Sequence, residues 1–499
     1  MANVIEERGL FWWFKQADGQ TNTKETSVSG ALTITEEGHI TLVLDGSLWY
    51  AEPPDPLPWG EPRPLPPHKW VTGLLASAGE IGQNGGHVLL CRLERTELPL
   101  EGEPQSYAAS ICITSDSPFS DGFDLANFDQ LRIELLGLED WLNLDSIHVE
   151  FEAIREDDVE VTVRYKNHRF LYDKPDASIS IESLTLGAPF FSFSDLPQRA
   201  ASFRQTYYLI YTTSATSTFD SLRYTFSQIE EFFALLLGSY FRLDWPTMVQ
   251  RRDEFEPWYR TYYLRGRPSE FKVNHYFEWT NFPALQESFG DLLCNWQAQV
   301  EQYGAGYYLY LATLRNPHPY REDSFVNLIW ALESLHRKKK RSEQIDASAL
   351  ERKTRIASIR EKLALADDPT DLHWFEDRAP HHERSPNLSD RIFNLLSQLP
   401  LAIDEKALRR FSMRCAERRN DISHEGGPRQ HETYLEFLGE VSNLNEALSY
   451  LYHALILHEI GLDEKLLVRA MTKGGLGESR ILPALLRVGI EIPNAAEPQ

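Results

Sequence analysis

The chain has 499 residues, of which 42% are hydrophobic and 25% charged, and it carries a formal net charge of −24. This length exceeds one compact core and predicts two or three domains, with enough apolar side chains for substantial cores. The four cysteines form no CxxC pair, which excludes a zinc ribbon and gives no sign of a disulfide framework. There is no N-terminal basic and apolar segment and no 18-residue apolar run, so we expect a cytoplasmic protein that does not span a membrane.

The charge is distributed unevenly along the chain. Residues 1–200 carry 33 acidic and 14 basic side chains, a balance of −19, which leaves −5 for the remaining 299 residues. Nucleic-acid binding draws its free energy from Lys and Arg, so the first 200 residues are poorly suited to gripping RNA. Exposed charges are screened beyond about 8–10 Å at physiological salt, so the net charge does not exclude a local basic cleft elsewhere in the chain.

Short apolar runs separated by turn residues predict β-structure in the first part of the chain. Residues 10–14, 30–34 and 40–44 are of this kind, and Glu37-Gly38 is a hairpin signal between the last two. About ten short strands before residue 215 predict a β-rich N-terminal domain over 1–215, built as a sandwich or a barrel. Further runs of the same kind lie at 87–91, 107–114, 146–154, 159–165 and 178–186.

Three other features of the first 280 residues bear on function. Eight prolines between residues 51 and 67 predict an extended surface loop. Trp141 is expected to anchor a core rather than to offer a ligand platform. Residues 241–280 interleave Arg with aromatic side chains, which can stack unpaired bases but more often fill an irregular core between domains.

From about residue 217 the apolar spacing changes to the three-to-four period of helices. Apolar stripes predict helices over 226–237 and 285–302. Together with the irregular segment between them, these helices make 216–304 a connecting region.

Most of the chain from residue 305 onward has helical periodicity, so we expect an all-α domain at 305–473 and a C-terminal tail at 474–499. Residues 366–388 are rich in Pro, Asp and His and predict a loop. A long apolar stripe predicts a helix over 432–458, and this stripe offers a face to a bundle partner or to a second copy of the chain.

For one helix of this domain the sequence indicates both the apolar face and the C-terminal end. Leu408, Phe411 and Cys415 repeat at helical spacing, and a Gly-Gly-Pro sequence at 426–428 stops the helix. The sequence Arg-Asn-Asp-Ile-Ser-His at 419–424 therefore lies on its last turns.

Arg419 and His424 pair a permanent cation with a group that titrates near neutral pH, as acid–base chemistry on a phosphodiester requires. In an ideal α-helix they lie about 140° apart around the axis and about 7.5 Å apart along it, whereas Asn420 is the i,i+4 neighbour of His424. A shared site requires Arg419 to reach around, a distorted helix end, or a second subunit. The dimer is the economical solution, because a two-fold axis creates one cleft with two Arg and two His.

The Arg-Asn-x-x-x-His sequence late in a helical domain resembles the motif of the HEPN (higher eukaryotes and prokaryotes nucleotide-binding) family. Residues 325–337, FVNLIWALESLHR, resemble the opening helix of the Apea-like HEPN subgroup. The runs at 30–34 and 40–46 resemble the N-terminal domain that accompanies this subgroup in bacterial anti-phage proteins. The resemblance covers most of the chain, loosely over the first 300 residues and more specifically from about 325 to 455.

The resemblance implies a metal-independent RNA endonuclease that acts in anti-phage defence by abortive infection. Arg419, His424 and Asn420 would form its catalytic site without a cofactor. Attack by the RNA's own 2′-OH would leave a 2′,3′-cyclic phosphate and a 5′-OH end. Glu333, on the opening helix, would support the site. The alternative is a non-catalytic HEPN-like module that binds nucleotides or proteins.

The partners expected on these grounds are an RNA substrate, a second copy of the chain bound through the C-terminal bundle, and a phage-derived protein trigger. The trigger would relieve a restraint that the N-terminal domain places on the nuclease. Because residues 1–200 carry a balance of −19, their surface favours a basic protein ligand or a contact with basic helices.

Two basic runs supply candidates for RNA contacts, one at 337–341 and one formed by the arginines around the motif. At each of these candidates the alternative is an ion pair on a solvated helix. Other chemistries lack their signatures, since the sequence contains neither GxxxxGK[ST] nor GxSxG. The His and carboxylate residues over 373–383 lack the i,i+4 His spacing of a helical metal site, so no metal is expected. The candidate RNA contacts are Arg418, Arg414, Lys338 and Lys339.

Overall fold

The chain divides into two compact units in the computed structural model. One unit comprises residues 1–230 and 241–273, and the other comprises residues 231–240 and 274–499. The finer division expected from the sequence, with boundaries near 216, 305 and 474, stays a prediction. The structure describes residues 3–14, 27–48, 70–76, 86–95, 105–120, 123–144, 147–155, 158–190, 200–250, 257–265, 279–315, 320–343, 347–364, 373, 375, 386–429 and 431–493.

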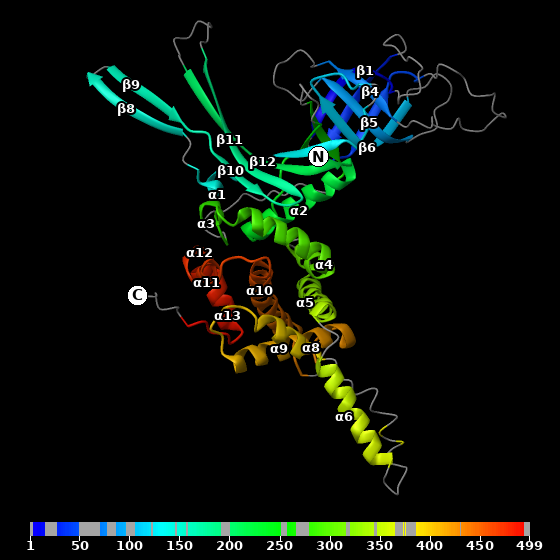
Figure 1. Ribbon diagram of the computed structural model, residues 1–499, viewed down its shortest axis with the longest axis vertical. Coiled ribbons are helices and arrows are strands. Elements are labelled where there is room, and N and C mark those ends of the chain that lie inside the picture. The colour runs from blue at the N-terminus through cyan, green and yellow to red at the C-terminus, as the bar shows by residue number, and fades with distance from the viewer. Residues whose placement is uncertain are drawn as a thin grey trace, which may run out of the picture. The chain divides into compact units, whose positions relative to one another are not determined.

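The N-terminal unit contains a closed six-stranded antiparallel β-barrel (Figure 1). The strands follow the order β1-β2-β3-β6-β5-β4, and β4 pairs with β1 to close the ring. The prediction of a β-rich sandwich or barrel is therefore confirmed as a barrel. Its strands are β1 (Asn3–Trp13), β2 (Val28–Thr35), β3 (Ile40–Leu44), β4 (Val71–Leu75), β5 (His87–Arg95) and β6 (Gln105–Ser115).

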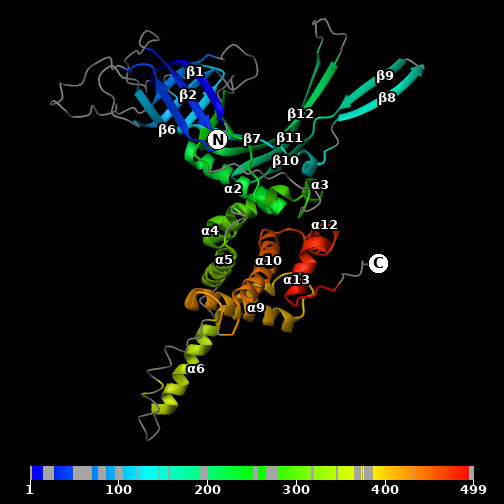
Figure 2. The ribbon, with the colours of Figure 1, turned by 180° about the vertical axis from the view of Figure 1, so that it is seen from behind.

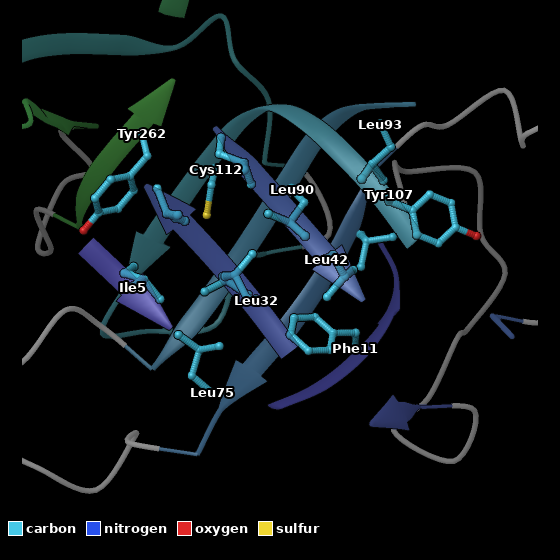
Figure 3. Close-up of a cluster of buried hydrophobic side chains, with 14 of the residues drawn as sticks. Ile5, Phe11, Leu32, Leu42, Leu75, Leu90, Leu93, Tyr107, Cys112 and Tyr262 are labelled. Atoms are coloured by element: carbon cyan, nitrogen blue, oxygen red, sulfur yellow. The ribbon is translucent and has the colours of Figure 1, made fainter. Parts of the chain in front are cut away.

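Alternating side chains of the barrel strands point inward and form an apolar core (Figure 3). Phe11, Leu32, Leu42 and Leu90 are fully buried in it. The predicted hairpin joins β2 to β3, and its Gly38 has φ +86°. A Cβ at Gly38 would lie 1.9 Å from the carbonyl oxygen of Tyr263, so this turn requires glycine.

Strand β6 connects the barrel to an open sheet. One edge of β6 pairs first with β3 and then, from Ile111 to Thr114, with β14, so the sheet continues in the order β14-β13-β7-β12-β11-β10. Strands β8 (Ile147–Arg155) and β9 (Asp158–Tyr165) form a separate two-stranded ribbon (Figure 2). The strands of the open sheet are β7 (Phe128–Glu134), β10 (Arg169–Asp173), β11 (Ala177–Phe190), β12 (Ala200–Ser217), β13 (Thr247–Val249) and β14 (Trp258–Tyr263).

Most of the described aromatic residues of 241–280 are buried, as the commoner of the two interpretations predicts, but Trp245 and Tyr262 lie in the barrel core rather than in a core between domains. Trp258 on β14 is half-exposed. Trp141, in the short helix α1 (Glu139–Leu142), is fully buried, as predicted. The proline-rich segment 51–67 lies outside the described residues.

The second unit is helical. Helix α5 packs against α4, α8, α9 and α10. The close approach of α4 to α5 depends on Gly306, because a Cβ there would lie 3.1 Å from Leu335 Cβ. Helix α2 (Phe219–Leu237) crosses from the first unit into the second. The remaining main helices are α3 (Phe282–Leu285), α4 (Phe289–Arg315), α5 (Arg321–Glu343), α6 (Ala347–Ala364), α8 (Leu388–Leu396), α9 (Glu405–Asn420), α10 (Tyr434–Glu459) and α11 (Glu464–Thr472).

The segment expected as a C-terminal tail contains further helical structure. It holds α12 (Gly474–Leu476), the π-helical turn η5 (Gly477–Ile481) and α13 (Leu482–Arg487), and α13 packs against α10. The predicted loop 366–388 lies largely outside the described residues. Among the helices that the structure describes, none combines the length and the apolar content needed to cross a bilayer.

Candidate functional site

Helix α9 carries the Arg-Asn-x-x-x-His sequence at its C-terminal end. The helix begins at the N-cap Asp404, whose carboxylate accepts a hydrogen bond of 2.8 Å from the backbone N–H of Ala407. Its apolar face, which includes Leu408, Phe411 and Cys415, is buried, as the spacing predicts. This packing fixes the direction of the helix and so the position of its last turns.

The helix does not stop at Asn420 but widens into a π-helical turn, η4 (Asp421–Glu425). Gly426 then ends it with φ +72°, in the left-handed region that favours glycine. A π-turn bonds i to i+5 and holds more residues per turn than an α-helix, so residues five apart turn toward the same side. Arg419 and His424 are five apart. The helix end between them is therefore distorted, which is one of the three solutions expected for a shared site.

The three predicted catalytic residues form no ion pair or hydrogen bond with a carboxylate among the described residues. Arg419 donates from Nη1 to Asn420 Oδ1 at 3.2 Å, and its Nε is buried without a partner. His424 is exposed, and its ring makes no hydrogen bond or ion pair within the described part of the chain. The guanidinium charge and the imidazole are therefore both available to a ligand.

Arg418, one residue before Arg419, has its charge paired with carboxylates. Its side chain is only 16% exposed and donates to both oxygens of Glu432, at 2.8 and 2.6 Å, and to Glu440 Oε2 from Nε at 2.7 Å. It also contacts the buried Asp421 at 3.3 Å. Burial opposes its charge, but the hydrogen bonds to Glu432 and Glu440 outweigh that effect and raise the pKa of Arg418.

Two more arginines complete this ion-pair network, which ties the end of α9 to α10 and to the connecting loop. Arg414 donates to Glu440 Oε1 at 2.9 Å, and Arg429 donates to Asp421 Oδ1 at 2.8 Å. Burial works against the ionised form of Glu440, but Arg418 and Arg414 together lower its pKa. The network contains Arg414, Arg418, Arg429, Asp421, Glu432 and Glu440, so three cations meet three anions.

The residues expected to contact RNA therefore divide into two groups. Arg414 and Arg418 are neutralised within the network, and Lys339 pairs with Glu459 and donates to Gln398 at 3.3 Å. Their charges hold the domain together, so we no longer propose them as RNA contacts. Lys338 is half-buried and has no partner among the described residues, so it stays a candidate.

Glu333 is not tied to the motif by any described contact. Its carboxylate binds Arg391 of α8 and, at 2.7 Å, Arg337 one turn further along α5. The Arg391 pair is largely buried, with 13% and 16% of the two side chains exposed. Glu333 therefore links α8 to α5. No described contact supports its expected role beside the catalytic residues.

A cavity of about 220 Å³ lies beside the π-helical turn. Ile422, Gly426 and Gly427 form one side of it, and Tyr434 and Phe437 from the start of α10 lie close to parallel, 6.4 Å apart. Tyr434 Oη donates to Glu322 Oε1 at 2.6 Å, and this hydrogen bond raises the pKa of Tyr434. The other lining residues are Tyr320, Glu322 and Asp323, at the start of α5.

The motif does not indicate the cavity residues at the starts of α5 and α10, nor Glu432 and Glu440 of the network. Tyr434 and Tyr320 are 55% and 82% exposed, but an exposed aromatic has no signature in sequence unless its neighbours are known. The only local signal is the Thr433–Glu436 capping box, which predicts where α10 begins and hence which face Tyr434 occupies.

Within the described residues, no group of three or more His, Cys, Asp or Glu side chains is arranged to hold a metal ion. The weak metal candidate at 373–383 lies outside these residues except for His373. The predicted chemistry at Arg419 and His424 uses side chains alone.

A helical domain that carries this motif at a helix end defines a HEPN-type protein, and comparison with known families agrees. Residues 6–296 match the family model of the ApeA N-terminal domain 1, and residues 326–466 match that of the Apea-like HEPN domain. The chain therefore belongs to the family of ApeA-like HEPN proteins. No curated protein and no solved structure matches it.

Proposed function

We propose that this protein is an anti-phage RNA endonuclease whose catalytic site is formed by Arg419, Asn420 and His424. Membership of the ApeA-like HEPN family supports an anti-phage nuclease role in general. The observation that carries the proposal is the charge pattern at the end of α9. The other arginines there are neutralised by carboxylates. Among the residues that the structure describes, Arg419 has no such partner, and five residues further on His424, in a π-helical turn, has none either.

In the proposed reaction the 2′-oxygen of a ribose attacks the adjacent phosphorus and the P–O5′ bond breaks. The proton leaves the 2′-OH and arrives on the 5′-oxygen, which gives a 2′,3′-cyclic phosphate and a 5′-OH end. In this proposal His424 accepts the first proton or donates the last one. Arg419 stabilises the extra negative charge on the phosphate oxygens with its planar fork of donors, and Asn420 orients Arg419.

We infer that the cavity beside the π-helical turn receives the base of a nucleotide next to the scissile phosphate. Aromatic rings stack unpaired bases, and Tyr434 and Phe437 provide such a surface. The carboxylates of Glu322 and Asp323 accept hydrogen bonds and suit the donor groups on a base edge rather than a phosphate. This arrangement separates the phosphate end of the site, at Arg419, from its base end.

A homodimer through the C-terminal bundle is also part of the proposal. Its ground is the need for two proton carriers and not the geometry of an ideal helix. One His424 cannot be base and acid in the same concerted step, and a two-fold copy would supply the second imidazole. Light scattering at assay concentration tests this. An active monomer would exclude the dimer and leave water or a ligand group as the second proton carrier.

The experiment that tests the function is cleavage of total RNA by the purified protein in EDTA, with the ends analysed chemically. A HEPN nuclease should give 2′,3′-cyclic phosphate and 5′-OH ends whether or not EDTA is present, and His424→Ala should give none. RNA that survives intact with wild-type protein, together with measurable nucleotide binding, would favour the non-catalytic module instead.

We further propose that the N-terminal unit restrains the nuclease until a phage-derived protein binds. Shifting such an equilibrium from 1:99 to 99:1 requires about 5.5 kcal/mol of differential affinity. A fragment starting at residue 274 tests restraint better than one starting at 305, because 305 lies inside α4. If the folded fragment is no more toxic in uninfected cells than the full chain, with His424→Ala controls for both, restraint is absent.

A further inference from the structure

A second cavity, of about 280 Å³, lies in the N-terminal unit on one face of the open sheet. Strands β7, β10, β11 and β12 supply its walls. Arg132 lies on β7, which pairs with β12 on one side and with β13 on the other, so its backbone is held within the sheet. Tyr208 pairs with Glu134, two residues along β7, and so projects from the same face as Arg132.

Arg132 is a permanent cation that forms no ion pair within the described part of the chain. Its guanidinium carbon lies 3.9 Å from the centre of the Tyr208 ring and 4.3 Å from that of Trp258. Its Nε is buried, and no carboxylate or other hydrogen-bond partner occurs among the described residues. Aromatic rings orient a guanidinium but leave its N–H donors unsatisfied. An unsatisfied buried donor carries a desolvation cost that a bound anion would remove.

Two more donors line the same cavity. His168 has a buried Nε2 without a partner, while its backbone is fixed by hydrogen bonds of 2.7 and 2.9 Å to Ser183. Asn167 uses its Oδ1 to accept from the N–H of Thr185 at 3.0 Å, which leaves the amide NH₂ as a donor. The carboxylate in the cavity, Glu182, is neutralised by Arg169 at 2.9 Å.

We propose that this cavity binds a carboxylate of an acidic, partly apolar segment of a protein partner. Arg132 and His168 would hold the carboxylate, and the cavity has room for a side chain but is smaller than the roughly 300–1,000 Å³ of most small-molecule sites. Leu184 in its lining and Leu171, on the same face of the edge strand β10, are exposed and offer apolar contact to the flanking residues of the segment. The proposal does not depend on nuclease activity.

The net charge of this region argues against a polyanion as the ligand. RNA presents a phosphate at every nucleotide, and the balance of −19 over residues 1–200 repels it, whereas one carboxylate requires only a local positive site. The net charge predicts that the acidic N-terminal region binds a basic protein. The proposal for this cavity is instead an acidic segment. The net charge describes the whole region, but Arg132 decides what binds in the cavity.

The test is calorimetric titration of the full chain with the capped peptide Ac-Ala-Leu-Glu-Leu-Ala-NH₂, its Gln-for-Glu analogue and inorganic phosphate. We expect the Glu peptide to bind at least tenfold more tightly than the Gln peptide, which corresponds to 1.4 kcal/mol. Arg132→Gln should abolish that preference. Arg164→Gln, which removes an arginine paired with Glu150 at 3.1 Å on the separate ribbon, should leave it unchanged.

Equal binding of the two peptides by wild-type protein would overturn the proposal. Phosphate binding more tightly than the Glu peptide, with the same dependence on Arg132, would overturn the assignment to a protein segment and identify a phosphate site. If Arg132→Gln melts at a lower temperature than wild type, His168→Leu provides the same test from the opposite wall. Loss of peptide discrimination in that variant supports the proposal, and its retention contradicts it.

Discussion

The ion-pair network and the proposed catalytic motif occupy adjacent residues at the end of one helix, yet they differ in the state of their charges. Arg418 contacts three carboxylates, whereas Arg419 contacts none among the described residues. With 74 acidic side chains in the chain, an unpaired arginine does not arise from a shortage of acids. Neighbouring arginines of one helix can differ in their ion pairs, because successive residues of a helix point about 100° apart.

The largest effect should come from breaking the motif. Arg419→Ala and His424→Ala should each lower RNA cleavage by about 10²- to 10⁴-fold while the melting temperature stays unchanged, because neither side chain packs in the core. Arg419→Lys should also fail, since a point charge lacks the planar fork. Arg410→Ala, on the same helix and exposed, is the matched control and should cleave normally. Normal cleavage by either alanine variant of the motif would refute the site.

Breaking the network should damage the fold instead. Arg418→Ala should lower the free energy of unfolding by about 3 kcal/mol, because it leaves the largely buried Glu432 without a cation and removes one of the two cations bound by Asp421 and by Glu440. Arg409→Ala, which removes a solvent-exposed pair with Glu405, should cost less than about 1 kcal/mol. Urea denaturation of both variants measures the difference. Equal costs would show that the network is as weak as a surface pair.

The cavity beside the motif should respond to the loss of an aromatic ring. Tyr434→Ala should raise the KM for RNA about 5- to 100-fold, since stacking of one base is worth about 1–3 kcal/mol. Tyr434→Phe keeps the ring and loses only the hydrogen bond to Glu322, so its KM should stay near the wild-type value. Steady-state cleavage assays distinguish the two, and a Phe variant as impaired as the Ala variant would contradict stacking.

His453 contrasts with His424 because it is buried. It stacks on Trp279 with ring centres 4.2 Å apart, accepts a hydrogen bond from or donates one to Tyr310 Oη at 2.5 Å, and burial lowers its pKa to about 3. The unfolded chain, with a pKa near 6.5, binds this proton first, so acid favours unfolding.

This histidine should give the smallest of the four effects. Stability should be constant above about pH 6.5 and fall by about 1 kcal/mol between pH 6.5 and 5.5 as the unfolded state takes up the proton. His453→Gln should flatten this dependence, measured by urea denaturation at each pH. A slope that persists in His453→Gln would contradict this assignment.

The sequence alone determined the features that depend on residues close together in the chain. Period-two runs located most barrel strands, Glu37-Gly38 located the first hairpin, and apolar stripes located α9 and α10. The position of the motif at a helix end followed from the glycine pair that ends the helix. These predictions succeeded because strand alternation, helix periodicity and turn chemistry act over a few residues.

Only the tertiary structure decided which charges are free and how the ends of elements are shaped. Arg418 meets Glu440, 22 residues away, and the barrel closes when β4 pairs with β1, more than fifty residues earlier in the chain. The π-helical turn begins at Asp421, whose buried carboxylate is paired with both Arg418 and Arg429. Such pairings are set by packing between distant elements, and a pattern of neighbouring residues carries no information about them.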